Sequence, residues 1–377
     1  MTTLFLLLFG LSALALFYIY VGYELLLKLL CLFFVEKCKA DSNHQPSVTV
    51  LVTVHNEEAL ISSRIENILA NGYLGDLSVV VCSDRSSDDT NRIAAEYEDS
   101  RVILLESNGS NGKSAAQNFA LDHITSEIVV FTDAETRFAS GFVTNLVAEF
   151  ADPSVGAVDG MLLFNGGNNG VVSGQSKYWQ AECRVRSYES SLGILAVCSG
   201  ACVAARRSLI DRLPEFVGED CVIPLQVVEK GFSVRHTHRA IAWDVYDSRA
   251  ELANRVRMTQ RNWQGTLLYP HLLNPLKYPG IAFALWSHKL LRWLSPIFLI
   301  LFSISLFVLG LLWDMVQLSL VVVFFYLVSI FGWLSKEKSL DYTLAEIAYS
   351  FLLANVGFLL GVIRGAFGRR VTSYKSS

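Results

Sequence analysis

Three features of familiar protein classes are missing from this sequence of 377 residues. Its seven cysteines include no Cys-x-x-Cys pair, and their odd number fits reduced thiols better than a disulfide framework. Its net charge of −4 gives no reason to expect nucleic acid as a partner. No internal repeat or low-complexity tract is visible, so the sequence does not indicate a repeat array.

The phosphate-binding loop of nucleotide hydrolases is also missing, although residues 107–118, SNGSNGKSAAQN, resemble it. That loop requires a glycine five positions before its Gly-Lys-Ser, where this chain has Ser107, and Gly109 comes two residues too late. The loop binds phosphate through backbone N–H groups in one curled geometry, so a misplaced glycine matters. The sequence argues against a P-loop ATPase, and this loop must serve another purpose.

Apolar residues are abundant, at 52% of the chain, and the excess lies at the two ends. Residues 4–20 are almost purely apolar, and the run continues to about Val35. Three further runs cover 297–313, 316–334 and 344–363. Since about 20 apolar residues cross a bilayer as a helix, we expect transmembrane helices within 1–40 and 295–377. The first run is long and no Lys or Arg precedes it, which favours a membrane anchor over a cleaved signal peptide.

Basic residues beside these runs predict the orientation of an integral membrane protein. Lys28, Lys37 and Lys39 follow the first run, and a second basic group, His288, Lys289 and Arg292, precedes the next. By the positive-inside tendency, the middle domain is cytoplasmic, at a plasma or bacterial inner membrane. Four simple crossings would put the last basic residues outside, against the same tendency; these are Arg364, Arg369, Arg370 and Lys375. A re-entrant or interfacial last segment would remove this conflict, and the sequence leaves the choice open.

The middle of the chain, residues 41–270, alternates between strand-like and helix-like patterns. β-rich runs cover 47–54, 77–82, 102–105 and 127–132, and helical patterns follow the first three, at 60–70, up to Ala95, and at 115–121. This alternation predicts an α/β fold with a mostly parallel, Rossmann-like sheet and helices on both faces. Polar residues follow each strand, at the edge where such sheets bind ligands.

A basic and aromatic stretch, residues 271–294, connects this domain to the second apolar run. Its alternation of apolar and basic-aromatic groups favours an amphipathic helix lying at the membrane interface. The alternative is that it simply forms the start of the next span, flanked by its anchoring residues.

Three acidic motifs are candidates for chemistry. Asp133 and Glu135 follow a strand and can share one Mg²⁺ or Mn²⁺ with substrate phosphate. Asp84, together with Ser86, offers acceptors for a base or ribose after the second strand. Asp220 precedes a predicted helix at 224–230 and could act as a general base. The structural alternative for each is a solvated or helix-capping acid.

In their order along the chain, these motifs resemble the inverting family-2 glycosyltransferases. The resemblance covers roughly residues 45–300 and is strongest to the membrane-embedded branch of cellulose, hyaluronan, chitin-oligosaccharide and poly-N-acetylglucosamine synthases. It rests on Val-His-Asn56-Glu57-Glu, Ser-Asp84-x-Ser86, Gly-Lys113-x-x-Ala-x-Asn118, Asp133-Ala-Glu135, Ser-Gly200-Ala, Glu219-Asp220 and a basic-aromatic segment around Trp263.

The resemblance implies a GT-A type fold and transfer from a nucleotide-diphosphate sugar, UDP-linked in most members of this branch. It implies Mg²⁺ or Mn²⁺ at Asp133 and Glu135, and Asp220 and Arg261 as the catalytic residues. The acceptor would be a lipid or a growing glycan at the bilayer, with polysaccharide-assembly proteins as possible partners. The residues implied in substrate binding are Asn56, Glu57, Asp84, Ser86, Lys113, Asn118, Asp133, Gly200, Glu219, Arg257, Gln260 and Trp263.

The chain departs from the family pattern at two places: the first affects the geometry of metal binding, and the second affects the expected product. Glu135 stands where most members have Asp, so a carboxylate is kept on a longer stem. Processive members carry Gln-x-x-Arg-Trp, whereas this chain reads Gln260-Arg261-Asn262-Trp263. On a helix, Arg257 and Arg261 share a face, while Trp263 is turned about 200° from Arg261. We therefore expect Trp263 to pack against the interface segment and the products to be short. A processive, polymer-exporting synthase and a catalytically silent nucleotide-sugar-binding subunit remain the alternatives.

Overall fold

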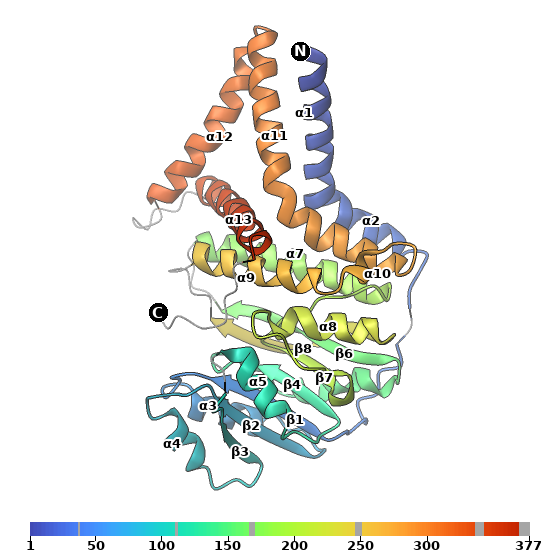
Figure 1. Cartoon of the computed structure of the whole chain (residues 1–377), viewed down its shortest axis with the longest axis vertical. Helices are drawn as coiled ribbons and strands as arrows, with labels where there is room; N and C mark the ends of the chain where they lie inside the picture. Colours follow the sequence, from blue (N-terminus) through green and yellow to red (C-terminus); the bar gives the residue numbers. More distant parts are fainter. Residues whose placement is uncertain (37, 110–111, 166–169, 246–250, 336–342, 369–377) are drawn as a thin grey trace.

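Figure 1 shows the computed structural model of the chain, which describes residues 1–36, 38–109, 112–165, 170–245, 251–335 and 343–368. An α/β domain lies at one end, and long helices extend from it at the other. Four of the basic residues used to predict the orientation, Lys37, Arg369, Arg370 and Lys375, lie outside the described residues.

The domain is built on one eight-stranded sheet in the order β3-β2-β1-β4-β7-β6-β8-β5. Strands β3, β2, β1 and β4 are parallel, as the sequence predicts, and β6 is parallel to β8. β7 runs antiparallel to β4 and β6, and β5 runs antiparallel to β8. The strands are β1 (Val48–Val54), β2 (Leu77–Ser83), β3 (Val102–Glu106), β4 (Ile128–Thr132), β5 (Arg137–Phe138), β6 (Val155–Asn165), β7 (Val203–Arg206) and β8 (Ser233–Val245).

Helices cover both faces of the sheet because its strands are apolar on both sides. Side chains alternate along β1, so Val50 and Val52 join one core with α3 and α6, whereas Leu51 joins the other with α5 and α8. The helices of the domain are α3 (Ile61–Leu69), α4 (Thr90–Ala95), α5 (Lys113–Leu121), α6 (Phe142–Val147), α7 (Gly170–Ser191), α8 (Glu219–Glu229) and α9 (Glu251–Leu267), with short 3₁₀ turns at Ala148–Ala151, Arg207–Leu209 and Pro270–Leu273.

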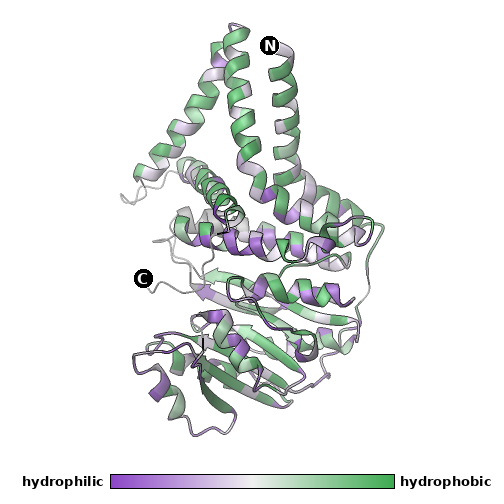
Figure 2. Ribbon diagram, viewed as in Figure 1, coloured by the Kyte–Doolittle hydropathy of each residue, from purple (hydrophilic) through white to green (hydrophobic). Residues whose placement is uncertain are grey.

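Four helical runs among the described residues are long and apolar enough to cross a membrane: Thr2–Leu30, Pro279–Leu312, Val316–Ser335 and Leu344–Ala366. The first joins α1 (Thr2–Phe17) to α2 (Tyr23–Leu30) through a π-helical turn, and the second joins α10 (Pro279–Ala284) to α11 (Leu291–Leu312) in the same way. The others are α12 (Val316–Ser335) and α13 (Thr343–Ala366). Figure 2 shows hydrophobic residues along α1, α11 and α12.

Candidate active site

The loops that follow β1 and β2 are bonded to each other. The Asn56 N–H donates to Ser86 Oγ at 3.0 Å, and Asn56 Oδ1 accepts from the Ser87 N–H at 2.7 Å. The Glu57 N–H donates to Thr90 Oγ1 at 2.8 Å. Asn56 adopts a positive φ of 57°, which asparagine tolerates better than most residues. Asn56 and Ser86, predicted to bind substrate, therefore hold together the rim of the site.

Asp84 connects this rim to the glycine-lysine loop. Its Oδ2 accepts a hydrogen bond from the Gly112 N–H at 2.8 Å, where the loop enters α5. Gly112 has φ 119°, a conformation that favours glycine. The other oxygen, Oδ1, is buried, lies 3.9 Å from Arg85 Nε and has no hydrogen-bond partner among the described residues. A buried acceptor without a hydrogen bond is costly unless a ligand supplies the donor, so Asp84 fits a role in binding.

Lys113 bridges two of the predicted acidic motifs. Its Nζ lies 2.6 Å from Asp133 Oδ1 and 2.6 Å from Glu219 Oε1, and its side chain is only 9% exposed. Burial alone would raise the pKa of Glu219, but the attraction of Lys113 and its hydrogen bond hold that pKa below its usual value. The Gly-Lys segment thus brings its cation between the carboxylates that follow β4 and begin α8.

Negative charge is in excess on the other side of Asp133. Burial, followed by repulsion from Asp244, Asp133 and Glu57, raises the pKa of Glu135 to about 7. Asp244 comes from β8, a strand that the sequence patterns did not reveal. Repulsion of this kind between neighbouring carboxylates fits a site for a divalent cation.

No group of three or more His, Cys, Asp or Glu side chains within the described residues could hold a metal ion. Mg²⁺ and Mn²⁺ prefer oxygen ligands, and Mg²⁺ is usually shared between one or two carboxylates and substrate phosphates. Asp133 and Glu135, which follow β4, supply two carboxylates of this kind.

Glu219 and Asp220 lie in the first turn of α8. This helix begins at Glu219, five residues before the start that the sequence predicted. Pro224 has no N–H to bond the carbonyl of Asp220, and the Cys198 N–H donates to that carbonyl instead, at 3.2 Å. This bond holds the predicted Ser-Gly200-Ala motif against α8. A Cβ on Gly200 would lie 3.0 Å from Glu219 Oε1, so glycine permits the close approach. Burial, followed by repulsion from Glu219, raises the pKa of Asp220.

Helix α9 presents its predicted residues in two directions. Arg261 Nη2 lies 3.4 Å from Ser114 Oγ on α5, and its positive charge acts on both Glu219 and Asp220. Arg257 is half-buried one turn earlier, while Gln260 is buried. Trp263 packs edge-to-face against Trp293 at a ring distance of 6.2 Å, together with apolar residues of α13. The predicted packing of Trp263 against the interface segment is confirmed.

Asn118 lies one turn beyond the glycine-lysine loop, on α5. Its Nδ2 donates to the Leu213 carbonyl and its Oδ1 accepts from the Leu213 N–H, both at 2.8 Å. The residue is buried, and both ends of its amide bond to one backbone segment. Asn118 therefore positions α5 against the segment that leads to Glu219.

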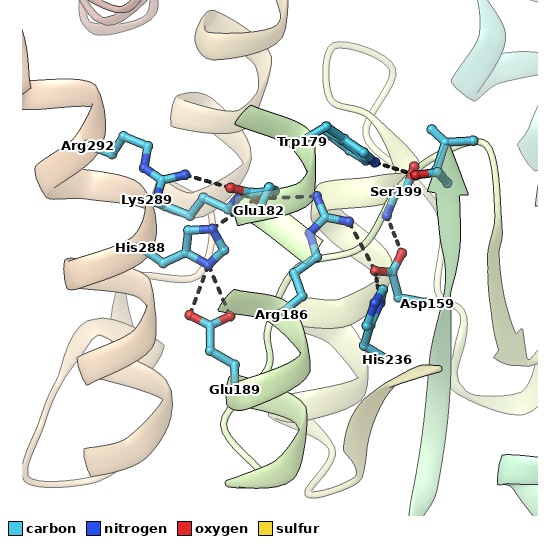
Figure 3. Close-up of polar contacts among 11 residues, drawn as sticks. Asp159, Trp179, Glu182, Arg186, Glu189, Ser199, His236, His288, Lys289 and Arg292 are labelled. Atoms are coloured by element: carbon cyan, nitrogen blue, oxygen red, sulfur yellow. Dashed lines mark hydrogen bonds and ion pairs between the residues drawn. The ribbon is translucent and has the colours of Figure 1, made fainter. Parts of the chain in front are cut away.

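Figure 3 shows a second group of buried charges, which we call the junction network. Glu182 on α7 accepts from His288, Lys289 and Arg292, at 2.9, 3.0 and 2.6 Å respectively. His288 also contacts Glu189 through Nδ1 at 2.9 Å. Although burial raises it, the interactions with His288, Lys289 and Arg292 hold the pKa of Glu182 well below its usual value. His288, Lys289 and Arg292, expected at an amphipathic surface, here face the protein interior because α7 supplies their carboxylates.

The junction network continues to the active site through Asp159 on β6. Its Oδ2 pairs with Arg186 at 3.0 Å and with His236 at 2.9 Å, and its Oδ1 accepts from the Ser199 N–H at 2.7 Å. Ser199 immediately precedes Gly200. The sequence did not predict a role for Asp159 or Glu182, because each is a single acidic residue that belongs to no motif of known spacing.

Comparisons with known proteins show the family to which this chain is similar. The family described as "Glycosyltransferase like family 2" matches residues 45–266. An N-acetylglucosaminyltransferase of Bradyrhizobium diazoefficiens is 28% identical over 253 residues, which are 61% of this chain and 52% of the relative. One of Rhizobium meliloti is 28% identical over 258 residues, 63% of this chain and 60% of the relative. The chain thus matches little more than half the length of these curated relatives.

A solved structure extends the likeness to nearly the whole chain. The mannosyltransferase PcManGT from Pyrobaculum calidifontis, in complex with GDP-Man and Mn²⁺, has a TM-score of 0.76. The match covers 96% of this chain and 100% of that one, at 20% sequence identity. This similarity shows a shared fold, the GT-A type sheet with apolar helices attached that the motif order implies.

Proposed function

This chain belongs to family 2 of the glycosyltransferases, and on that premise we propose that it transfers a sugar from a nucleotide-diphosphate sugar, with inversion, to a lipid or glycan hydroxyl at the membrane surface. The observation that carries the proposal is the bridge from Lys113 to Asp133 and Glu219, with Asp220 and Arg261 beside it. It joins a diphosphate-binding edge of the sheet to a carboxylate suited to proton transfer.

Asp220 acts as the general base. Its raised pKa brings it nearer to neutral pH, where a base accepts a proton most effectively. Its carboxylate takes the proton of the acceptor hydroxyl, and the hydroxyl oxygen forms a bond to the anomeric carbon from the face opposite the diphosphate. The bond from that carbon to the diphosphate oxygen then breaks, and a nucleoside diphosphate leaves.

The remaining residues bind the donor and offset the leaving charge. Arg261 and Lys113 are cations suited to a diphosphate. Asp84 Oδ1, which accepts no hydrogen bond within the described residues, would accept one from a nucleobase or ribose. Mg²⁺ or Mn²⁺, when bound at Asp133 and Glu135, supplies further positive charge for the diphosphate. Glu57, Gly200, Arg257 and Gln260 would shape the same site, with Asn56, Ser86 and Asn118 holding its walls and Trp263 packing behind α9.

The proposed domain boundaries are a membrane helix at 1–40, a catalytic domain at 41–270, an interface region at 271–294 and membrane helices at 295–377. We place the catalytic domain in the cytoplasm, where nucleotide sugars are made, at a plasma or bacterial inner membrane. N-acetylglucosamine, linked to UDP, is the first donor sugar to test, because the curated relatives are N-acetylglucosaminyltransferases.

The test is a panel of nucleotide sugars offered to detergent-purified protein with Mg²⁺ or Mn²⁺. Nucleoside diphosphate release and product mass are measured beside an Asp220→Asn control. We expect transfer from at least one UDP sugar and products with one or a few added sugars. Donor binding without release would favour the catalytically silent subunit, and a high-mass homopolymer would contradict short products.

A further inference from the structure

One face of α13 is a row of glycines, and it lies directly along α9. Gly357, Gly361 and Gly365 are spaced by four residues, about one helical turn. A Cβ on each would lie 2.6 to 2.9 Å from an α9 side chain; the pairs, in order, are with Arg255, Thr259 and Trp263. These partners are also four residues apart, so the two helices run side by side in the same direction for more than two turns.

Because α9 is polar, this contact limits the depth of α13 in the membrane. α9 carries Arg255, Arg257 and Arg261, and Arg261 faces the candidate active site. Charged side chains are costly at the centre of a bilayer, so α9 lies outside the hydrocarbon core. A helix that follows α9 so closely over this length cannot pass through the core there.

The middle of α13 is also held at the domain end of the membrane helices. Asn355 Oδ1 accepts from the Tyr20 hydroxyl at 3.2 Å and from Ser295 Oγ at 2.8 Å. Tyr20 follows α1 and Ser295 lies in the second turn of α11, where both runs meet the domain. Figure 1 shows α1, α11 and α12 extending away from this level, while α13 stays beside α9. A spanning helix would place its middle at the centre of the bilayer.

We propose that α13 does not cross the membrane but lies at the lipid surface on the side of the catalytic domain, where it holds α9 in place. Only α1, α11 and α12 then cross, among the described helices. Exposed apolar residues, such as Ile347, Val356 and Ile363, provide contact with lipid. Arg364 is thereby kept on the side of the catalytic domain, which removes the charge conflict of four simple crossings. The position of α13 does not depend on the proposed reaction, whereas the test of its hold on α9 uses that reaction as its readout.

Three variants, each with one added cysteine, test the topology. Leu74→Cys lies on the catalytic domain, Met315→Cys at the turn between α11 and α12, and Phe367→Cys at the end of α13; all three positions are exposed, at 83%, 50% and 82%. Each full-length variant is treated with a membrane-impermeant maleimide in sealed cells and after opening of the membrane. The unmodified protein, with its seven thiols, gives the background.

We expect Phe367→Cys to react with the same sidedness as Leu74→Cys, and Met315→Cys with the opposite sidedness. If Phe367→Cys follows Met315→Cys, or reacts from neither side, the proposal is overturned. A second pair tests the contact with α9. Gly361→Leu should lower transfer at least tenfold without changing the labelling pattern, whereas Gly10→Leu, on α1 with open space around it, should leave transfer unchanged. Equal transfer by both variants would refute the role of α13 in holding α9.

Discussion

Lys113 at the candidate active site and Glu182 in the junction network are both buried ions with more than one partner, yet their surroundings differ. Glu182 is matched by His288, Lys289 and Arg292. Lys113 pairs with Asp133 and Glu219, but Glu135, Asp244 and Glu57 add further negative charge nearby.

This difference in charge balance indicates a structural role for the junction network and a binding role for the candidate active site. A carboxylate surrounded by cations, as in the junction network, has its charge satisfied by the protein itself. The carboxylates around Glu135 instead leave a negative field that would attract a metal ion and, through that ion, a diphosphate. We therefore expect changes at the active site to remove activity with little loss of stability, and changes in the junction network to do the reverse.

The largest expected effect is that of Asp220→Asn. Loss of a general base should lower turnover by about 10²–10⁴-fold. Because the base acts only in the chemical step, donor affinity should stay near that of the unmodified protein. Calorimetry of donor binding beside a turnover assay checks this. Equal losses in both would instead identify Asp220 as a helix cap.

Asp133→Asn should reduce turnover by about 10²–10³-fold and weaken metal-dependent donor binding, because it removes a carboxylate that would hold the metal ion, and with that ion the positive charge that offsets the diphosphate. Glu135→Ala should act in the same direction, but less strongly. Titration with a UDP sugar in the presence and absence of Mn²⁺ measures both. If metal-dependent binding survives both changes, the metal assignment is wrong.

Arg261→Ala and Trp263→Ala compare a residue expected to act in catalysis with one expected to act in packing, both on α9. Arg261→Ala should lower turnover by about 10²-fold, since it removes a cation from the leaving diphosphate. Trp263→Ala should instead destabilise the protein, by about 2–3 kcal/mol for a half-buried aromatic residue, with turnover kept. Thermal unfolding in detergent and turnover are measured for both. A stronger loss of turnover in Trp263→Ala than in Arg261→Ala would place the tryptophan in the acceptor site.

Glu182→Gln tests the junction network. Removal of one partner of a buried ion pair lowers the free energy of unfolding by about 3–5 kcal/mol, because the remaining cations are buried without an opposite charge. Glu24→Gln is the matched control: it breaks a largely exposed pair with Arg184, which should cost about 0–1 kcal/mol. Unfolding midpoints of the two variants check this. Similar unfolding midpoints for the two variants would mean that the junction network does not stabilise the fold.

Much of the fold could be predicted from local patterns. β1 to β4 occur within one residue of the β-rich runs because buried parallel strands require short apolar β-branched segments. The polar residues that follow these strands meet at one edge, as parallel pairing dictates: Asp84 bonds to the loop that precedes Lys113, and Lys113 pairs with Asp133. Strands β5 to β8 were not predicted: β5 has two residues, and β6, β7 and β8 contain glycine, alanine or charged residues in place of a continuous β-branched apolar run.

By itself, the sequence determined the order of the motifs, the apolar runs and the period that turns Trp263 away from Arg261, because each depends on residues close together in the chain. Only the tertiary structure decided which charges meet. It places Asp244 near Glu135, although more than a hundred residues separate them in the chain. It also bonds both ends of the Asn118 amide to the backbone of Leu213, and it buries His288 against α7. It also lays α13 along α9, although the composition of α13 matches that of a spanning helix. Composition sets how much apolar surface a helix must bury, but the neighbouring elements decide whether lipid or protein covers it.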